Sequence, residues 1–164
     1  MLVRFKKLHP DAVVPYKKYP EDFCYDVVAT SEREIAPNVW KYGIGLAFEI
    51  EGKPEDLVVE DEFGKELLRI PQGRGWNVSL DLRPRSSIWK TGMVLSNAVG
   101  TIDELYRGEV SAVFYHVFPD MPRYRVGDRI GQIKLGFTLP IEFEEVDELI
   151  QTARGDGGYG STGR

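Results

Sequence analysis

One stretch of the chain, residues 97–109, carries side chains that could do chemistry on a planar ligand. It reads Asn-Ala-Val-Gly-Thr-Ile-Asp-Glu-Leu-Tyr-Arg-Gly-Glu and lies between two apolar runs, residues 93–95 and 110–117. Because Asn and Gly tolerate positive φ, we expect a tight, hairpin-like turn with exposed main-chain donors and acceptors. Asp103 could act there as a general base, and Tyr106 could present its ring face. A β-turn without any chemistry is the commoner explanation of such a composition taken alone.

A second group of residues suits an anion. Arg85, Ser86 and Ser87 precede a short helical turn that we expect to run to Lys90. Serine is a good N-cap residue, which would account for the serines structurally. The free N–H groups at such a start also attract anions, so Arg85 and the two hydroxyls could hold phosphate oxygens. Gln132, on a later expected strand, could donate its amide N–H to the same oxygens.

The remaining reactive residue types are sparse. Asp26 lies in a short apolar run, where a carboxylate could simply cap a turn. Cys24 is the single cysteine, so no internal disulfide can form, and such a residue is more often part of the core than a nucleophile. The two histidines, His9 and His116, have no clustered partner, which disfavours a metal site built on histidine.

Alternating apolar residues predict the strands that must position these groups. With little helical periodicity and many Gly and Pro turns, the pattern predicts an all-β, jelly-roll-like barrel. Residues 51–75 interrupt it with an acidic segment, which we expect to form an extra hairpin-like insertion with Gly64 at a positive-φ corner. The main expected strands cover residues 1–8, a strand–turn–strand over 35–50, and residues 76–82, 110–117 and 129–137.

Composition and charge restrict the function. The 164 residues suffice for one domain, which we place at residues 1–150, followed by a flexible, Gly-rich tail at 151–164. Within this domain, residues 142–149 fit either a helix or an extended arm, and we favour the arm. The formal net charge of -5 argues against a nucleic-acid surface but not against a nucleotide. No membrane span and no signal peptide are recognisable, so we expect a cytoplasmic protein.

Five stretches in the same order resemble the motifs of the trimeric dUTPase family. The sequence departs from the usual pattern at Phe23 and Cys24, where the family has small residues, and at Tyr159, where phenylalanine is commoner. The long segment 51–82 also replaces what is usually a short turn. The five stretches are residues 25–29, 84–87 (with Gly92 after it), 97–109, 127–132 and 154–163.

The resemblance implies a dUTP diphosphatase, a hydrolase of nucleotide metabolism. Such an enzyme converts dUTP to dUMP and pyrophosphate, which prevents uracil incorporation into DNA and supplies dUMP for thymidylate synthesis. The family is homotrimeric, with active sites at subunit boundaries and a swapped C-terminal arm. It uses magnesium, which we expect to be held mainly by the substrate phosphates and water, so that few direct protein ligands are needed and none is assigned.

The resemblance also implies roles for single residues. Asp103 would activate the attacking water, Asp26 would form part of the active-site wall, and the tail would close over the site. The base and sugar would meet Asn97, Gly100, Thr101, Ile102, Asp103, Tyr106 and Tyr159. The phosphates would meet Arg85, Ser86, Ser87, Gln132, Arg154, Ser161 and Thr162.

Two alternatives keep the same scaffold. A dCTP deaminase shares the Arg-Ser-Ser feature but needs a carboxylate at the base end of the pocket, and residues 113–116 contain no glutamate. A non-catalytic nucleotide-sensing protein would not need Asp103, whose presence therefore favours an enzyme.

Overall fold

The computed structural model describes residues 2–51, 56–71, 77–139 and 141–158, and within them the protein is built almost wholly from antiparallel strands. Apart from the 3₁₀ turn η2 (Ser86–Lys90), no helix is present in these ranges. The all-β, jelly-roll-like prediction is confirmed. The strands are β1 (Leu2–Lys7), β2 (Tyr25–Val28), β3 (Ser31–Ala36), β4 (Val39–Gly43), β5 (Leu46–Glu51), β6 (Asp56–Glu60), β7 (Glu66–Pro71), β8 (Asn77–Arg83), β9 (Met93–Leu95), β10 (Gly100–Asp103), β11 (Ser111–His116) and β12 (Arg129–Thr138).

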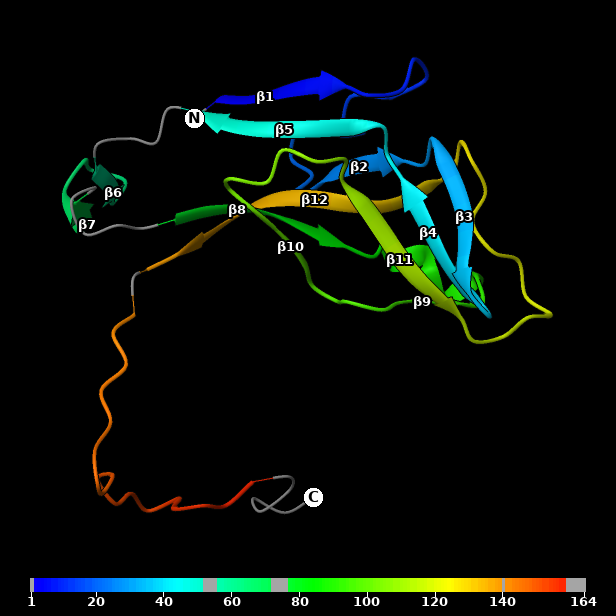
Figure 1. Ribbon diagram of the computed structural model, residues 1–164. Coiled ribbons are helices and arrows are strands. Elements are labelled where there is room, and N and C mark those ends of the chain that lie inside the picture. The colour runs from blue at the N-terminus through cyan, green and yellow to red at the C-terminus, as the bar shows by residue number, and fades with distance from the viewer. Residues whose placement is uncertain (1, 52–55, 72–76, 140, 159–164) are drawn as a thin grey trace.

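Two four-stranded sheets form the body of the molecule. One has the order β10-β8-β12-β2 and the other the order β3-β4-β11-β9, while β1 and β5 form a two-stranded sheet. In Figure 1 strands β3, β4 and β11 run diagonally across the β8–β12 sheet. Alternation explains why these segments are strands, since Val78, Leu80 and Leu82 are buried and the residues between them are not.

The core lies between the sheets and is centred on three aromatic rings. Tyr42 from β4, Phe114 from β11 and Tyr124 pack edge to face, with centroids 5.4–6.2 Å apart. The Tyr42 hydroxyl donates to the Tyr124 carbonyl at 2.8 Å. Edge-to-face rings contribute beyond their buried area, so this cluster holds the connection at Tyr124 against β4 and β11.

A charged network anchors the connection before β12. Arg123 Nη1 lies 3.1 Å from Glu32 Oε1, and its guanidinium stacks 3.4 Å from the Trp40 ring centroid. Burial raises the pKa of Glu32, but hydrogen bonds from Arg123 and Arg125, the charge of Arg123 and the Val126 N–H outweigh it and hold that pKa below its ordinary value. The network fixes the point at which β12 begins.

The strand–turn–strand expected over residues 35–50 is wrong in detail, because three strands occupy this region. Asn38, at φ 61°, turns β3 into β4, and Gly45, at φ 67°, separates β4 from β5. A side chain at Gly45 would meet His9 and Thr30 within 3.0 Å. Period two continues through this break, so alternation alone did not reveal it.

The predicted insertion is confirmed as a separate hairpin. Within the described residues β6 and β7 form a two-stranded sheet of their own, and Gly64 turns the chain at φ 77°. Figure 1 shows the hairpin standing apart from the two sheets. The arm that we favoured over a helix is also observed, since residues 141–150 contain no helix and all are exposed.

Candidate active site

The stretch 97–109 is not the tight turn that the sequence suggested. β9 and β11, the runs on either side, do pair antiparallel, but their connection contains β10, which pairs with β8 in the other sheet. Neither Asn97 nor Gly100 has positive φ. The connection therefore crosses from one sheet to the other, and the crossing creates a cavity instead of a simple reversal.

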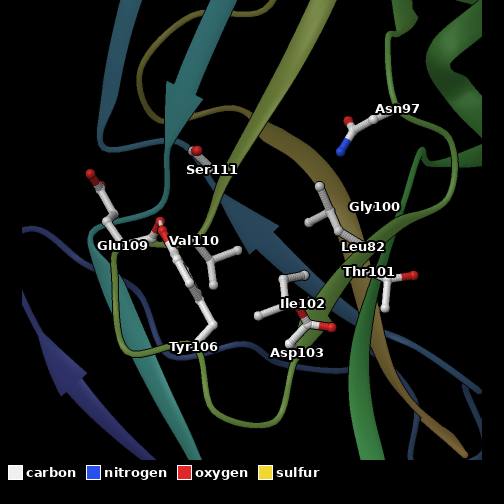
Figure 2. Close-up of a pocket in the computed structure, with 10 residues that line it drawn as sticks. All are labelled: Leu82, Asn97, Gly100, Thr101, Ile102, Asp103, Tyr106, Glu109, Val110 and Ser111. Atoms are coloured by element: carbon white, nitrogen blue, oxygen red, sulfur yellow. Dashed lines mark hydrogen bonds between the residues drawn. The ribbon is translucent and has the colours of Figure 1, made fainter.

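That cavity, which we call the Asp103 pocket, has a volume of about 170 Å³. Figure 2 shows Asp103 and Tyr106 rising from the lower part of the loop and Asn97 facing them from the other end. Six of the seven residues expected around the base and sugar line it. Its lining is Leu82, Asn97, Gly100, Thr101, Ile102, Asp103, Tyr106, Glu109, Val110 and Ser111.

The ring of Tyr106 is held in place before any ligand binds. Its hydroxyl donates to the Glu109 carbonyl at 3.0 Å. A Cβ on Gly108 would lie 2.6 Å from the Tyr106 Cζ, so only glycine lets the ring lie there. Glu109 Oε1 in turn accepts the Gly45 N–H at 2.9 Å, which ties this end of the loop to the body. Tyr106 itself remains 47% exposed, so much of the ring is available for contact.

A second cavity, which we call the Asp26 pocket, has a volume of about 290 Å³. It contains four of the predicted residues, namely Asp26, Arg85, Ser86 and Gln132. β12 brings them together because Gln132 pairs with Asp26 on β2 and with Arg83 on β8. The lining is Tyr16, Lys17, Lys18, Tyr19, Asp22, Phe23, Cys24, Asp26, Arg85, Ser86, Arg129 and Gln132.

Asp26 holds two arginines in this pocket. Its Oδ1 accepts from Arg85 Nε at 3.0 Å, and its Oδ2 accepts from Arg129 Nη1 at 3.0 Å. The Asp26 side chain is 16% exposed and that of Arg85 24%, so the Asp26–Arg85 ion pair is mostly removed from water. Both guanidinium groups are thus oriented with donors left over for an anion.

The serines do not cap the helical turn as expected. η2 does begin at Ser86, but its N-cap is Arg85, which makes no capping hydrogen bond with its side chain. Ser86 lines the Asp26 pocket, whereas Ser87 lines neither pocket. Helix capping therefore does not explain Ser86, and among the hydrogen bonds described its hydroxyl makes none, so it can bind a ligand.

The described part of the tail, residues 151–158, lines neither the Asp103 pocket nor the Asp26 pocket. Arg154 is exposed, and its Nε donates to the Gly157 carbonyl at 2.9 Å. Figure 1 shows residues 141–158 leading away from the sheets. Tyr159, Ser161 and Thr162 lie outside the described residues.

The sequence interpretation missed three of the four basic residues of the Asp26 pocket, namely Lys17, Lys18 and Arg129. Arg129 lies inside one of the five motifs, but no role had been given to it. Lys17 and Lys18 form an adjacent pair before Asp26, and this charge pair was the available signal. The Asp103 pocket also gains Leu82 and Glu109, which only the pairing of β10 with β8 and the fold of the loop reveal.

Comparisons with known proteins identify the family of the chain. The chain matches the family model described as dUTPase over residues 79–163. The deoxyuridine 5'-triphosphate nucleotidohydrolase of Nautilia profundicola is 32% identical over 100% of both chains. The protein of the same name from Wolinella succinogenes is 33% identical over 100% of this chain and 95% of its own. The chain belongs to the dUTPase family.

Solved structures of dUTPases share the fold. A mutant dUTPase of Staphylococcus bacteriophage 80alpha with dUpNHpp has a TM-score of 0.71 at 19% identity, covering 99% of both chains. A mutant dUTPase from phage phi11 of S. aureus, described with a structural Mg(II) ion, has a TM-score of 0.63 at 16% identity and covers 92% of this chain and 100% of its own. The long insertion therefore leaves the dUTPase body intact.

The donor set of this dUTPase suits a magnesium ion that keeps its waters. Among the described residues, no group of three or more His, Cys, Asp or Glu side chains is arranged to hold a metal. Asp26 already has each of its oxygens bonded to an arginine. Magnesium is often bound mainly by substrate phosphates and water, a mode that needs few protein ligands. No helix in the described part is long and apolar enough to cross a membrane.

Proposed function

We propose that this dUTPase splits dUTP into dUMP and pyrophosphate by attack of a water activated by Asp103, with the base and sugar in the Asp103 pocket and the outer phosphates in the Asp26 pocket. The observation that carries the proposal is that the two pockets have linings of different chemical character. One combines main-chain groups, a tyrosine ring and a carboxylate, while the other is lined by four cationic side chains.

Base selection follows from the main-chain groups of β10. Main-chain N–H and C=O groups near Asn97 and Gly100 can bond the donors and acceptors on the uracil edge. Cytosine exchanges a donor and an acceptor on that edge. A mismatch leaves buried groups unpaired, which can give discrimination on the order of 10⁴. Thymine differs by a methyl group and is rejected by packing. The fixed ring of Tyr106 lies under the deoxyribose and leaves no room for a 2'-hydroxyl.

The phosphates bind to oriented donors. Arg85, held by Asp26, the Ser86 hydroxyl and the Gln132 amide bond the phosphate oxygens, and Ser87 lies one residue further along the same turn. Magnesium, bound through the phosphates and water, neutralises charge on the triphosphate when present. Donors already fixed in place stabilise developing charge without reorganisation, so the Asp26–Arg85 pair favours departure of pyrophosphate.

The chemical step needs one base. Asp103 accepts a proton from a water whose oxygen forms a bond to the α-phosphorus. The bond between that phosphorus and the bridging oxygen breaks, and its electron pair leaves with pyrophosphate. Asp103 is exposed at the edge of its pocket, where it can release the proton to solvent.

A homotrimer completes the site. Among the described residues the two pockets share no lining residue, and the arm exposes Phe143 at 94% and Ile150 at 94%. Such apolar exposure indicates a missing partner. We propose that the arm crosses to a neighbouring subunit, so that Arg154, Tyr159, Ser161 and Thr162 close over the neighbour's site. The substrate also places the enzyme in the cytoplasm, where nucleotides and magnesium are available.

One assay tests the activity. The protein is incubated with dUTP, dCTP, dTTP or UTP and magnesium, and pyrophosphate and ammonia are measured separately. Pyrophosphate from dUTP alone is expected. Ammonia from dCTP would instead support a deaminase, and binding of dUTP without products would support a nucleotide sensor.

A mixing experiment tests the shared site. Chains truncated after Thr152 lack the tail, and full-length Asp103→Asn chains lack the base, so each homotrimer should be nearly inactive. Co-refolded mixtures should regain dUTP hydrolysis because a mixed trimer combines an intact Asp103 with an intact tail. No recovery, with mixed trimers confirmed by mass spectrometry, would rule out a tail that crosses between subunits.

A further inference from the structure

The loop between residues 16 and 26 is closed on itself before any ligand binds. The main chains of Tyr16 and Asp26 exchange two hydrogen bonds, of 3.3 and 2.8 Å, at its base. Inside the loop, Asp22 Oδ2 accepts the Tyr19 N–H at 3.1 Å, and the Asp22 N–H donates to the Tyr19 carbonyl at 3.1 Å. The loop is therefore a defined wall of the Asp26 pocket, and its side chains are presented from fixed positions.

Two adjacent lysines of this loop line the pocket. Lys17 Nζ lies 3.5 Å from the Pro20 carbonyl oxygen and 4.6 Å from the Tyr25 ring centroid. Lys18 is exposed, and its Nζ lies 5.1 Å from the Tyr19 ring centroid. Neither ammonium has a carboxylate within ion-pair distance among the described residues. Both charges are thus available to a ligand.

The charges of the pocket do not balance. Its lining carries four cations, Lys17, Lys18, Arg85 and Arg129, against the carboxylates of Asp22 and Asp26. The Asp26 carboxylate is shared by the two arginines. The cavity therefore carries a net charge of two positive units in a chain whose net charge is -5. An excess of this sign in a concave site concentrates anions.

We propose that Lys17 and Lys18 bind the pyrophosphate part of the substrate, with Lys18 as a direct ligand and Lys17 as a second cation at the loop. The identity of this ligand rests on the proposed function. The α-phosphorus must lie near Asp103, whose pocket contains no residue of this loop. The two outer phosphates are then the groups that reach the lysines, and they become the leaving pyrophosphate.

Lys17 and Lys18 add positive charge to the Asp26 pocket from outside the five motifs. Positions 17 and 18 lie outside the motifs, in the segment that leads to the atypical Phe23 and Cys24. A lysine ammonium acts as a mobile point charge, whereas the arginines give fixed, forked donors. The loop lysines therefore strengthen polyphosphate binding without setting the geometry of the α-phosphorus.

The decisive variant is Lys17→Met with Lys18→Met, compared with Lys6→Met with Lys7→Met. The second pair is also adjacent and changes the net charge equally, but both of its lysines are exposed on β1 and line neither pocket. Binding of inorganic pyrophosphate is measured by calorimetry and inhibition by dUMP by kinetics. Hydrogen bonds to charged groups support an expected loss of about tenfold or more in pyrophosphate affinity for the first pair, with dUMP inhibition unchanged. The β1 pair should match the wild type.

The single variant Lys18→Met controls for the possibility that the double variant disturbs the loop. Among the hydrogen bonds described, Lys18 makes none to the loop backbone, so its replacement should leave the loop in place. It should still weaken pyrophosphate binding several-fold, and Lys18→Arg should restore it. Equal losses for the two double variants, or no loss for Lys18→Met, would overturn the proposal. If the wild type does not hydrolyse dUTP, the proposed function fails, whereas an active wild type with lysine-independent pyrophosphate binding removes only the role of the lysines.

Discussion

The Asp103 pocket and the Asp26 pocket are built in opposite ways. The first comes mainly from one loop between β9 and β11, and its key ring is fixed by a neighbour two residues away. The second comes from four segments, namely the 16–24 loop, β2, the start of η2 and β12. The first is poor in positive charge and the second is rich in it. Selectivity thus depends on local packing in one pocket, while affinity depends on charges that the whole fold assembles in the other.

This contrast explains which parts of the site the sequence revealed. The residues of the Asp103 pocket are close together in the chain, so a motif could indicate them. The Asp26–Arg129 pair joins residues 103 positions apart, and no local pattern indicates that pair. Ser86 and Gln132 were expected near phosphate from the motifs, but the counter-charge that orients Arg85 required the pairing of β2 with β12.

The same contrast holds for the fold: local sequence patterns predicted some strands, whereas features that depend on contacts between separate segments were missed. Alternation predicted β1, β8 and β12, and turn chemistry predicted the hairpin at Gly64. The crossing of the 97–109 loop between sheets was missed because β10 pairs with β8, from which η2 and β9 separate it in sequence. The break at Gly45 was missed because its cause is the close approach of His9 and Thr30.

The largest effect that separates the pockets is expected at Asp103. Asp103→Asn should lower turnover of dUTP by about 10²–10⁴-fold, because an amide cannot accept the proton of the attacking water. The fold should be retained because Asp103 is exposed and not part of the core, and binding of a non-hydrolysable dUTP analogue should be nearly unchanged because asparagine keeps the size and polarity of the side chain. Single-turnover kinetics and calorimetry measure the two quantities. Near-normal turnover in a folded variant would remove Asp103 from this role.

A smaller effect is expected at Asp26. In Asp26→Asn the pocket gains positive charge but loses the group that orients both arginines. We expect kcat/KM to fall about tenfold or more, because misplaced donors lose much of their value to the reaction. The two explanations predict opposite changes in pyrophosphate affinity, so the measurement distinguishes them. If bulk charge mattered more than orientation, pyrophosphate would bind more tightly to Asp26→Asn, and the contrast between the arginines and the loop lysines would disappear.

A selectivity effect, smaller again, is expected at Gly108. Gly108→Ala places a methyl group against the Tyr106 ring and must move it. The ratio of kcat/KM for dUTP over UTP should fall several-fold, and Tyr106→Ala should lower it at least as much, since a few ångströms of freed space relieve the steric rejection of a 2'-hydroxyl. Competition assays with both nucleotides measure the ratio. A ratio unchanged in both variants would mean that another group distinguishes the sugars.

The smallest effect is expected from the β6–β7 hairpin. Deleting residues 53–70 and closing the gap with two glycines should leave dUTP hydrolysis and trimer mass nearly unchanged. In the part of the chain that the structure describes, β6 pairs with β7 alone and no hairpin residue lines the Asp103 or Asp26 pocket. Carboxylates such as Glu60, Asp61 and Glu62 would also repel a triphosphate at close range. Kinetics and light scattering on the deleted chain are the measurements. A folded trimer that had lost affinity for dUTP would show that the hairpin contributes to the dUTP site in the assembly. The site would then consist of the two pockets and the hairpin.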